Sequence, residues 1–170
     1  LKANADPNCR DEYGNTPLHY LAYKTFNPEP QHQAVMQQLI KAGCDINLRN
    51  WQVEEEDVGG QTPLHLAVAN KEFLAFVNML LEAKAEVNVQ DDELRTPLHV
   101  AALNGCTEAA ALLIKHGAQL EARTAQGETP LHLACCWEVE GWLGILLKRE
   151  NERQAHDLVP LLLQNGADIE

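Results

Sequence analysis

The chain has 170 residues and a formal net charge of −12, with 25 acidic and 13 basic side chains. This charge argues against a nucleic-acid partner, because proteins that bind phosphate backbones present a positive surface. No apolar run approaches the roughly 18 residues that span a bilayer, and the first residues lack a basic-then-apolar leader pattern. Five cysteines without a regular spacing favour a reducing, cytoplasmic environment.

A four-residue motif, Thr-Pro-Leu-His, divides the chain into similar units. It begins at Thr16, Thr62, Thr96 and Thr129, at intervals of 46, 34 and 33 residues. Threonine before proline is typical of a helix start, because the hydroxyl accepts a bond from a first-turn amide and proline needs no amide partner there. A repeat near 33 residues predicts a solenoid, in which stacked units share one elongated core.

The third unit shows the pattern without interruption. Two stretches in it carry apolar residues at helical spacing, and each ends at a glycine. The inward residues are Leu98, Ala101 and Ala102 in the first stretch, and Ala110, Leu113 and Ile114 in the second. Each stretch is shorter than the roughly 12–15 residues that an isolated helix needs. The helices therefore depend on their neighbours in the stack.

The other units depart from this pattern by insertions. A proline-bounded loop at 25–30 precedes a second helix predicted over 31–42, and an extension at 51–57 lengthens the next hairpin. In the fourth unit, extra residues at 137–157 precede a helix predicted over 158–165, and this enlarged end is either a cap or a docking face. The inward residues of the helix at 31–42 are predicted to be Val35, Leu39 and Ile40.

Three residues stand at unusual places in these units. Leu94 replaces the hairpin glycine, where it is either exposed or packed on the next hairpin. Lys84 replaces a helix-ending glycine. Trp51 lies in the lengthened hairpin, where it is either a binding anchor or folded back onto the neighbouring hairpin.

The complete pattern resembles the ankyrin repeat: Asp-x-x-Gly-x-Thr-Pro-Leu-His, two helices, then Gly-Ala-Asp-x-Asn. The resemblance covers nearly the whole chain. It implies an all-α repeat solenoid of stacked antiparallel helix pairs joined by β-hairpin loops. A single domain is then predicted over 1–170, and both ends look cut, so we expect a fragment of a longer protein. The tail and hairpin of a preceding repeat occupy 1–15, and the repeats occupy 16–61, 62–95, 96–128 and 129–170.

One histidine per repeat invites a metal or catalytic interpretation: His19, His65, His99 and His132. The resemblance instead implies a structural role, in which each histidine ties one loop to the next. Packed helices lie roughly 8–10 Å apart, whereas zinc ligands lie about 2.0–2.3 Å from the metal. His132, Cys135 and Cys136 share a helix face, so a metal-dependent thiol enzyme is an alternative hypothesis. We predict no enzyme activity and no catalytic, cofactor or metal site.

The asparagines that close the hairpins are also predicted to be structural, because their side chains can bind the hairpin backbone. They are Asn8, Asn47 and Asn88.

The resemblance further implies a protein–protein interaction module that binds through hairpin tips and the concave face of the helices. The predicted contact residues are Tyr13, Tyr23, Lys24, Trp51, Glu54, Glu55, Asn70, Asp92, Glu93, Arg95, Leu103, Asn104, Gln126, Glu128 and Trp137. The acidic charge predicts a protein partner with a basic or mixed-charge surface. We expect a cytoplasmic monomer without membrane insertion, with the nucleus or a host cytosol as other locations. The alternative is a regulatory or substrate-targeting domain of a larger enzyme or pathogen effector, whose catalytic part lies elsewhere.

Overall fold

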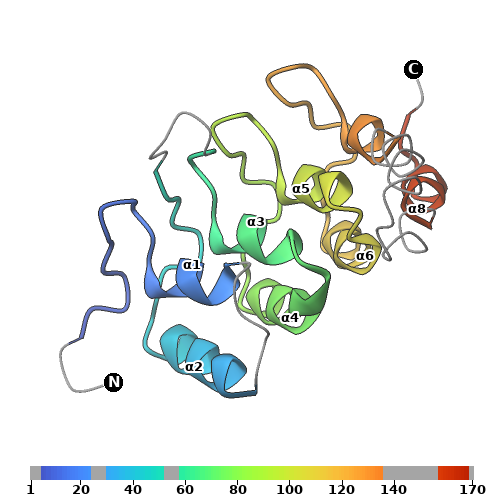
Figure 1. Ribbon diagram of the computed structural model, residues 1–170. Coiled ribbons are helices and arrows are strands. Elements are labelled where there is room, and N and C mark those ends of the chain that lie inside the picture. Colours follow the sequence, from blue (N-terminus) through green and yellow to red (C-terminus); the bar gives the residue numbers. More distant parts are fainter. Residues whose placement is uncertain (1–4, 24–29, 52–57, 136–156, 169–170) are drawn as a thin grey trace, which may run out of the picture.

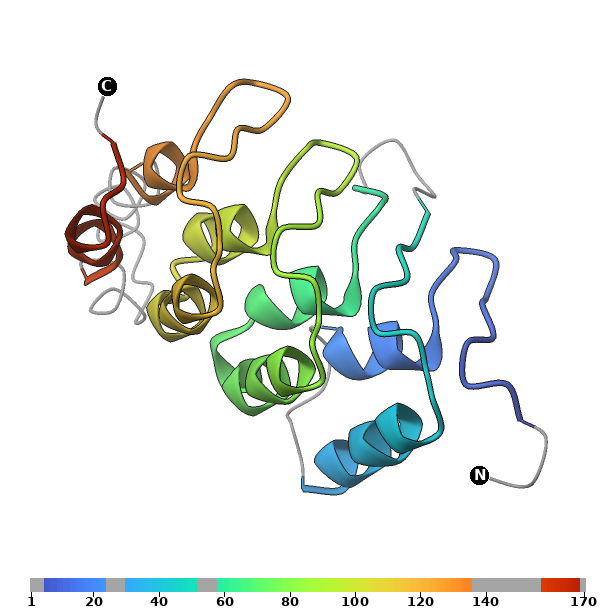
Figure 2. The same ribbon diagram turned by 180° about the vertical axis from the view of Figure 1, so that it is seen from behind.

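The Thr-Pro-Leu-His motifs begin the first helix of successive pairs, which stack side by side in the computed structural model (Figure 1). The structure describes residues 5–23, 30–51, 58–135 and 157–168. The helices are α1 (Pro17–Ala22), α2 (Pro30–Lys41), α3 (Pro63–Val68), η1 (Lys71–Phe73), α4 (Leu74–Glu82), α5 (Pro97–Leu103), α6 (Thr107–Lys115) and α8 (Leu158–Gln164). Residues 130–135 are also helical. Long loops project from the same side of the stack in both views (Figure 2).

Each first helix starts as the motif predicts. Thr16, Thr62 and Thr96 are N-caps in extended backbone conformation, and proline follows in the first turn. In each cap, the side chain of the histidine three residues later accepts a hydrogen bond from the backbone amide of the threonine, while the threonine side chain accepts one from the histidine backbone. The start of the helix is thus capped in both directions. This reciprocal cap explains why helices of six or seven residues begin at a fixed point.

The core runs through the stack as one cluster, as a solenoid requires. Its largest fully buried side chains include Phe73 and Phe76, whose ring centroids lie 5.1 Å apart. The predicted inward residues of the third repeat are buried, apart from Ile114, which is partly exposed. The fold class predicted from the repeat pattern is thus confirmed: an all-α solenoid of helix pairs with hairpin loops, with no strand assigned in the described ranges.

The inward face of α2 differs from the prediction at one position. Val35 is 45% exposed, whereas Met36 and Leu39 are buried and Ile40 is partly buried. Met36, Leu39 and Ile40 have the spacing i, i+3, i+4 and so form one stripe. Val35 lies beside that stripe, on the helix surface that remains open to solvent.

Leu94 is held in a backbone conformation that normally favours glycine. Its φ is 60°, close to the 72°, 75° and 83° of Gly14, Gly60 and Gly127 at the same place in the other hairpins. A side chain costs energy there, because Cβ approaches the following carbonyl oxygen. The Leu94 side chain is 45% exposed, so burial does not offset the cost.

We expect Leu94→Gly to raise the free energy of unfolding by about 1 kcal/mol, because it removes this steric conflict. Urea unfolding followed by circular dichroism measures the change. Leu94→Ala is the matched control, because it removes the exposed side chain but keeps Cβ. An equal gain in both variants would show that backbone strain is not the cause.

Candidate functional site

Backbone hydrogen bonds join the hairpins into a row. The amide of Trp51 donates to the carbonyl of Tyr13 at 2.9 Å, and the amide of Asp92 donates to that of Gly59 at 3.0 Å. The amide of Ala125 likewise donates to the carbonyl of Glu93 at 2.9 Å. The same hydrogen bond between neighbouring hairpins thus recurs from repeat to repeat, and it fixes the spacing of the hairpin tips.

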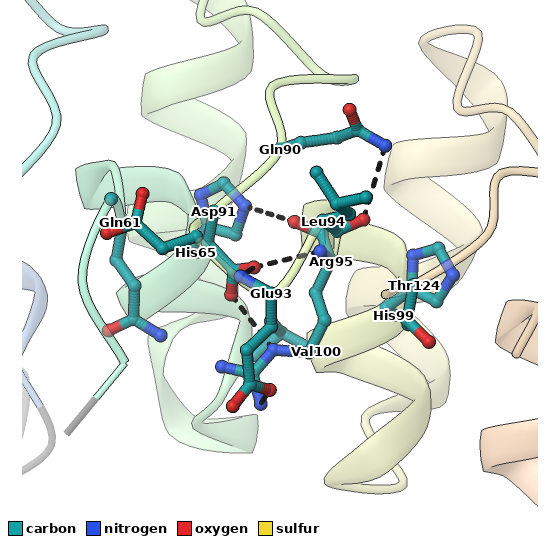
Figure 3. Close-up of polar contacts among 12 residues, drawn as sticks. Gln61, His65, Gln90, Asp91, Glu93, Leu94, Arg95, His99, Val100 and Thr124 are labelled. Carbon is teal, nitrogen blue, oxygen red and sulfur yellow. Dashed lines mark hydrogen bonds and ion pairs between the residues drawn. The ribbon is translucent and has the colours of Figure 1, made fainter. Parts of the chain in front are cut away.

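Below the tips, the repeat histidines connect each first helix to the next hairpin. Nε2 of His19, His65 and His99 lies 3.1, 3.1 and 3.2 Å from the carbonyl oxygens of Gln61, Arg95 and Glu128, respectively. Nδ1 of each ring accepts from the backbone amide of its capping threonine at 3.1–3.2 Å. A ring that accepts at Nδ1 is neutral, so its proton is on Nε2, which donates to the carbonyl. Figure 3 shows this bond for His65.

Burial keeps these rings neutral. It lowers the pKa of His65 from 6.5 to about 4, and it also lowers the pKa of His19 and His99. The three rings are at most 1% exposed, and each uses both nitrogens within the protein. Their arrangement fits the structural role implied by the resemblance, not proton transfer to a substrate.

A second set of bonds connects the repeats where each hairpin begins. Carboxamide oxygens of Asn8, Asn47 and Asn88 accept the amides of Asp45, Glu86 and Gln119 in the next repeat, at 2.7–2.9 Å. Glu121 takes the place of the asparagine in the hairpin after the third repeat, and its Oε1 accepts the amide of Asp168 at 2.8 Å. These side chains therefore join successive repeats, and do not merely close their own hairpins.

The three tyrosines of the chain, together with Trp51, line one hollow of 560 Å³. Tyr13 comes from the first hairpin, Tyr20 and Tyr23 from the end of α1 and the residue after it, and Trp51 from the second hairpin. The other lining residues are Asn15, His19, Asn50, Val58, Gln61 and Leu66. We call this feature the aromatic hollow. Tyr20, Tyr23 and Trp51 are each 53% exposed, so large ring surfaces face solvent.

Of the two alternatives for Trp51, the structure shows the packing on the neighbouring hairpin. Its amide binds the preceding hairpin, and a Cβ at Gly14 would lie only 2.7 Å from the indole Cδ2. The guanidinium of Arg10 lies over the ring, 5.5 Å from its centroid. Trp51 thus folds back onto the neighbouring hairpin and still leaves half of its surface in solvent.

A smaller hollow of 210 Å³ continues the aromatic hollow along the first helices. The two share Tyr23, Gln61 and Leu66. The predicted contact residues Arg95, Leu103 and Asn104 line the smaller one, together with His65, Ala69 and Val100. Six predicted residues therefore lie along one continuous surface: Tyr13, Tyr23, Trp51, Arg95, Leu103 and Asn104.

Ion pairs fix the charged groups of the third hairpin. Nε of Arg95 lies 2.9 Å from Oδ2 of the buried Asp91, and Nη1 lies 3.2 Å from Oε2 of Glu93 (Figure 3). Asp91 Oδ1 also accepts the amides of Glu93 and Arg95. Asp92 pairs with Arg49 of the preceding hairpin. Asp92, Glu93 and Arg95 are thus all paired within the protein, and of these ion pairs only that between Arg95 and Asp91 is shielded from solvent.

Among the remaining predicted contact residues, the described ones, Asn70, Gln126 and Glu128, do not line either hollow. Asn70 accepts the amide of Glu72 at 3.0 Å and so caps η1. Gln126 and Glu128 lie in the fourth hairpin, where both amides donate to the Thr124 hydroxyl. Lys24, Glu54, Glu55 and Trp137 fall outside the described residues.

Sequence reasoning missed Tyr20 and Leu66 as candidate contact residues. Tyr20 lies three residues before Tyr23, a spacing that in a continuing helix would place both on one face, although Tyr23 is the extended residue that ends α1. This signal was available in the sequence. The exposure of Leu66 depends on how α3 packs against its neighbours, which the apolar pattern of a short helix does not specify.

The metal-dependent alternative gains no geometric support. Within the described ranges, no group of three or more His, Cys, Asp or Glu side chains is placed to hold a metal ion. Nδ1 of His132 lies 2.7 Å from the Thr129 hydroxyl, and Cys136 lies outside the described residues. A search of the described helices also finds none long and apolar enough to cross a membrane.

Comparison with known proteins identifies the repeat. The family described as ankyrin repeats, in three copies, matches residues 1–91 and again 73–170. The chain is 39% identical over 144 residues to Rabankyrin-5 of Mus musculus, covering 78% of this chain and 12% of that protein. It is 35% identical over 135 residues to Neurogenic locus notch homolog protein 1 of Homo sapiens, covering 79% and 5%. It is 30% identical over 110 residues to NF-kappa-B inhibitor alpha of Sus scrofa, covering 63% and 35%. The family matches span both halves of the solenoid, and the chain belongs to the ankyrin repeat family.

Proposed function

We propose that this chain is a non-catalytic protein-interaction module, which binds a partner through its hairpin tips and the face formed by α1, α3 and α5. The observation that carries the proposal is the aromatic hollow. Every tyrosine of the chain lies there, with Trp51, in a solvent-open site built by the first two hairpins, α1 and α3. Tyrosine and tryptophan are enriched among the few residues that carry most of the binding energy of protein interfaces. The hydrogen-bonded hairpin row holds this surface in place before a partner arrives.

The relatives support a partner that is itself a protein. NF-kappa-B inhibitor alpha is, as its name says, an inhibitor of NF-kappa-B. The chain spans only 12% of Rabankyrin-5 and 5% of the notch homolog, so such modules occur within much longer chains. A regulatory or substrate-targeting domain in a larger enzyme or effector would use the same surface. We propose an intracellular, monomeric module in either case.

Binding should depend on the aromatic hollow. We expect Tyr23→Ala with Trp51→Ala to weaken partner binding at least about tenfold, because truncating interface anchors typically costs 2 kcal/mol or more. Partners are captured from a cytosolic lysate by the native chain, identified by mass spectrometry, and titrated against both forms by calorimetry.

The matched control is Leu74→Ala with Leu163→Ala, which truncates exposed apolar side chains on α4 and α8 that do not line the hollow. This variant should bind as the native chain does. If the control loses the partner and the Tyr23/Trp51 variant keeps it, the binding surface lies elsewhere on the solenoid.

A further inference from the structure

The described residues that line the aromatic hollow supply rings and neutral polar groups. Among them there is no lysine and no arginine. Its one histidine, His19, is neutral, because Nδ1 accepts the amide of Thr16. The polar atoms come from Asn15, Asn50 and Gln61. The described part of the wall thus presents no like charge to a cation, and the nearby Arg10 acts on His19 from outside the lining.

A carboxylate at the rim makes one ring more attractive to a cation. The hydroxyl of Tyr20 donates to Oδ2 of Asp11 at 2.6 Å. Burial raises the pKa of Asp11, but hydrogen bonds from Tyr20, Asn15 and Tyr13 outweigh it, so the pKa lies below its ordinary value. The ionised carboxylate draws the phenol proton toward itself and leaves the ring richer in electrons. Aromatic faces attract cations through this electron density.

The chain already places one cation on an aromatic face at this site. The Arg10 guanidinium lies over Trp51, and its Nη1 donates to the carbonyl oxygen of Arg49 at 3.0 Å. That bond anchors Arg10 to the second hairpin, and Arg10 is not among the lining residues of the hollow. Tyr20 and Tyr23 line the same hollow and are each 53% exposed.

We propose that the aromatic hollow binds the cationic side chain of an arginine or lysine on the protein partner. The proposal rests on the proposed function and names the chemistry that the surface recognises. The ring faces would hold the cation, while Asp11 and the exposed Glu12 complement its charge from the rim. The net charge of −12 would guide a basic segment toward this face. A partner with a neutral residue at that position would bind more weakly than one with arginine or lysine there.

Small probes test the hollow without knowledge of the partner. The full chain, labelled with ¹⁵N, is titrated with N-acetyl-arginine-methylamide and with the lysine equivalent, and the indole N–H of Trp51 is followed by NMR. The citrulline equivalent is the matched neutral probe, because it has nearly the shape of arginine without its charge. We expect saturable shifts with arginine or lysine, and none with citrulline over the same concentrations.

Two variants separate the contribution of the rings from that of charge alone. Tyr23→Leu keeps the charge and removes an exposed ring, and it should weaken arginine or lysine binding about three- to fivefold. Asp11→Asn keeps an oxygen that can accept the turn amides but removes the carboxylate, and it should also weaken binding. Thermal unfolding confirms that each variant is folded.

Equal binding of citrulline, or no shift with either cation, would overturn the proposal. Unchanged binding by folded Tyr23→Leu would overturn the role of the rings. These results concern only the recognition of a cation. Partner binding by the same surface is tested separately, by loss of capture in the Tyr23/Trp51 double variant, so a failure of one proposal can be distinguished from a failure of the other.

Discussion

Replacing His65 with alanine should lower the free energy of unfolding by about 3–4 kcal/mol. The ring satisfies the buried amide and hydroxyl of Thr62 through Nδ1, and the carbonyl of Arg95 through Nε2. Each buried polar group left without a partner costs about 1–3 kcal/mol, and loss of a helix cap adds about 1 kcal/mol. Because the side chain is 0% exposed, water does not reach these groups without local opening. Urea unfolding followed by circular dichroism measures the loss.

His132→Ala provides the matched control for that measurement. His132 occupies the same position of the motif and binds the hydroxyl of Thr129, but its side chain is exposed. Water can therefore replace the ring, and we expect a loss of only about 1 kcal/mol, typical of a cap. Equal losses in both variants would mean that the bond from His65 to the next hairpin contributes little. The difference between the variants thus measures how strongly one repeat depends on the next.

Local rules explain why so much of the fold could be predicted from the sequence. Thr62 and Pro63 specify where α3 begins through groups within four residues, and the histidine that completes the cap is part of the same motif. Helix α8, predicted over 158–165, is observed over Leu158–Gln164, with Pro160 in the first turn, where its missing amide is tolerated. Each of these signals is short-ranged, so a single sequence is enough to read it.

The aromatic hollow could be predicted only in part, because it joins residues far apart in the chain. Tyr13 and Trp51 were each recognised as candidates, but their contact depends on the bond between two hairpins. The insertion at 51–57 prevented the sequence from showing which residues of the two hairpins pair, since it shifts the residues that follow Trp51 relative to the other repeats. Leu94 shows the same limit. The sequence shows that Leu94 stands in place of a glycine, but only the structure shows that the leucine side chain is exposed to solvent.

Acid should weaken the solenoid in a defined range of pH through its buried histidines. The pKa of His65 is about 4 in the folded chain and near 6.5 when unfolded. Between these values the unfolded chain binds more protons than the folded one, so the free energy of unfolding falls as pH is lowered. The stabilisation is complete above about pH 6.5 and is lost as pH falls toward 4. For His65 the loss amounts to roughly 3 kcal/mol, calculated from the shift in pKa.

Urea unfolding at a series of pH values between 7 and 4 measures this slope, and His65→Gln identifies its origin. A glutamine side chain does not titrate, so the variant should be less stable at pH 7 but should lose less stability on acidification than the native chain. His19 and His99 also have a lowered pKa, so the variant should retain part of the dependence of the unfolding free energy on pH. Asp11 acts in the same direction at lower pH, because its pKa lies below 3.8. An unchanged slope in His65→Gln would place the acid sensitivity in other groups. A reduced slope would show that protonation of His65 weakens the fold, and so that its bond to the next hairpin depends on a neutral ring.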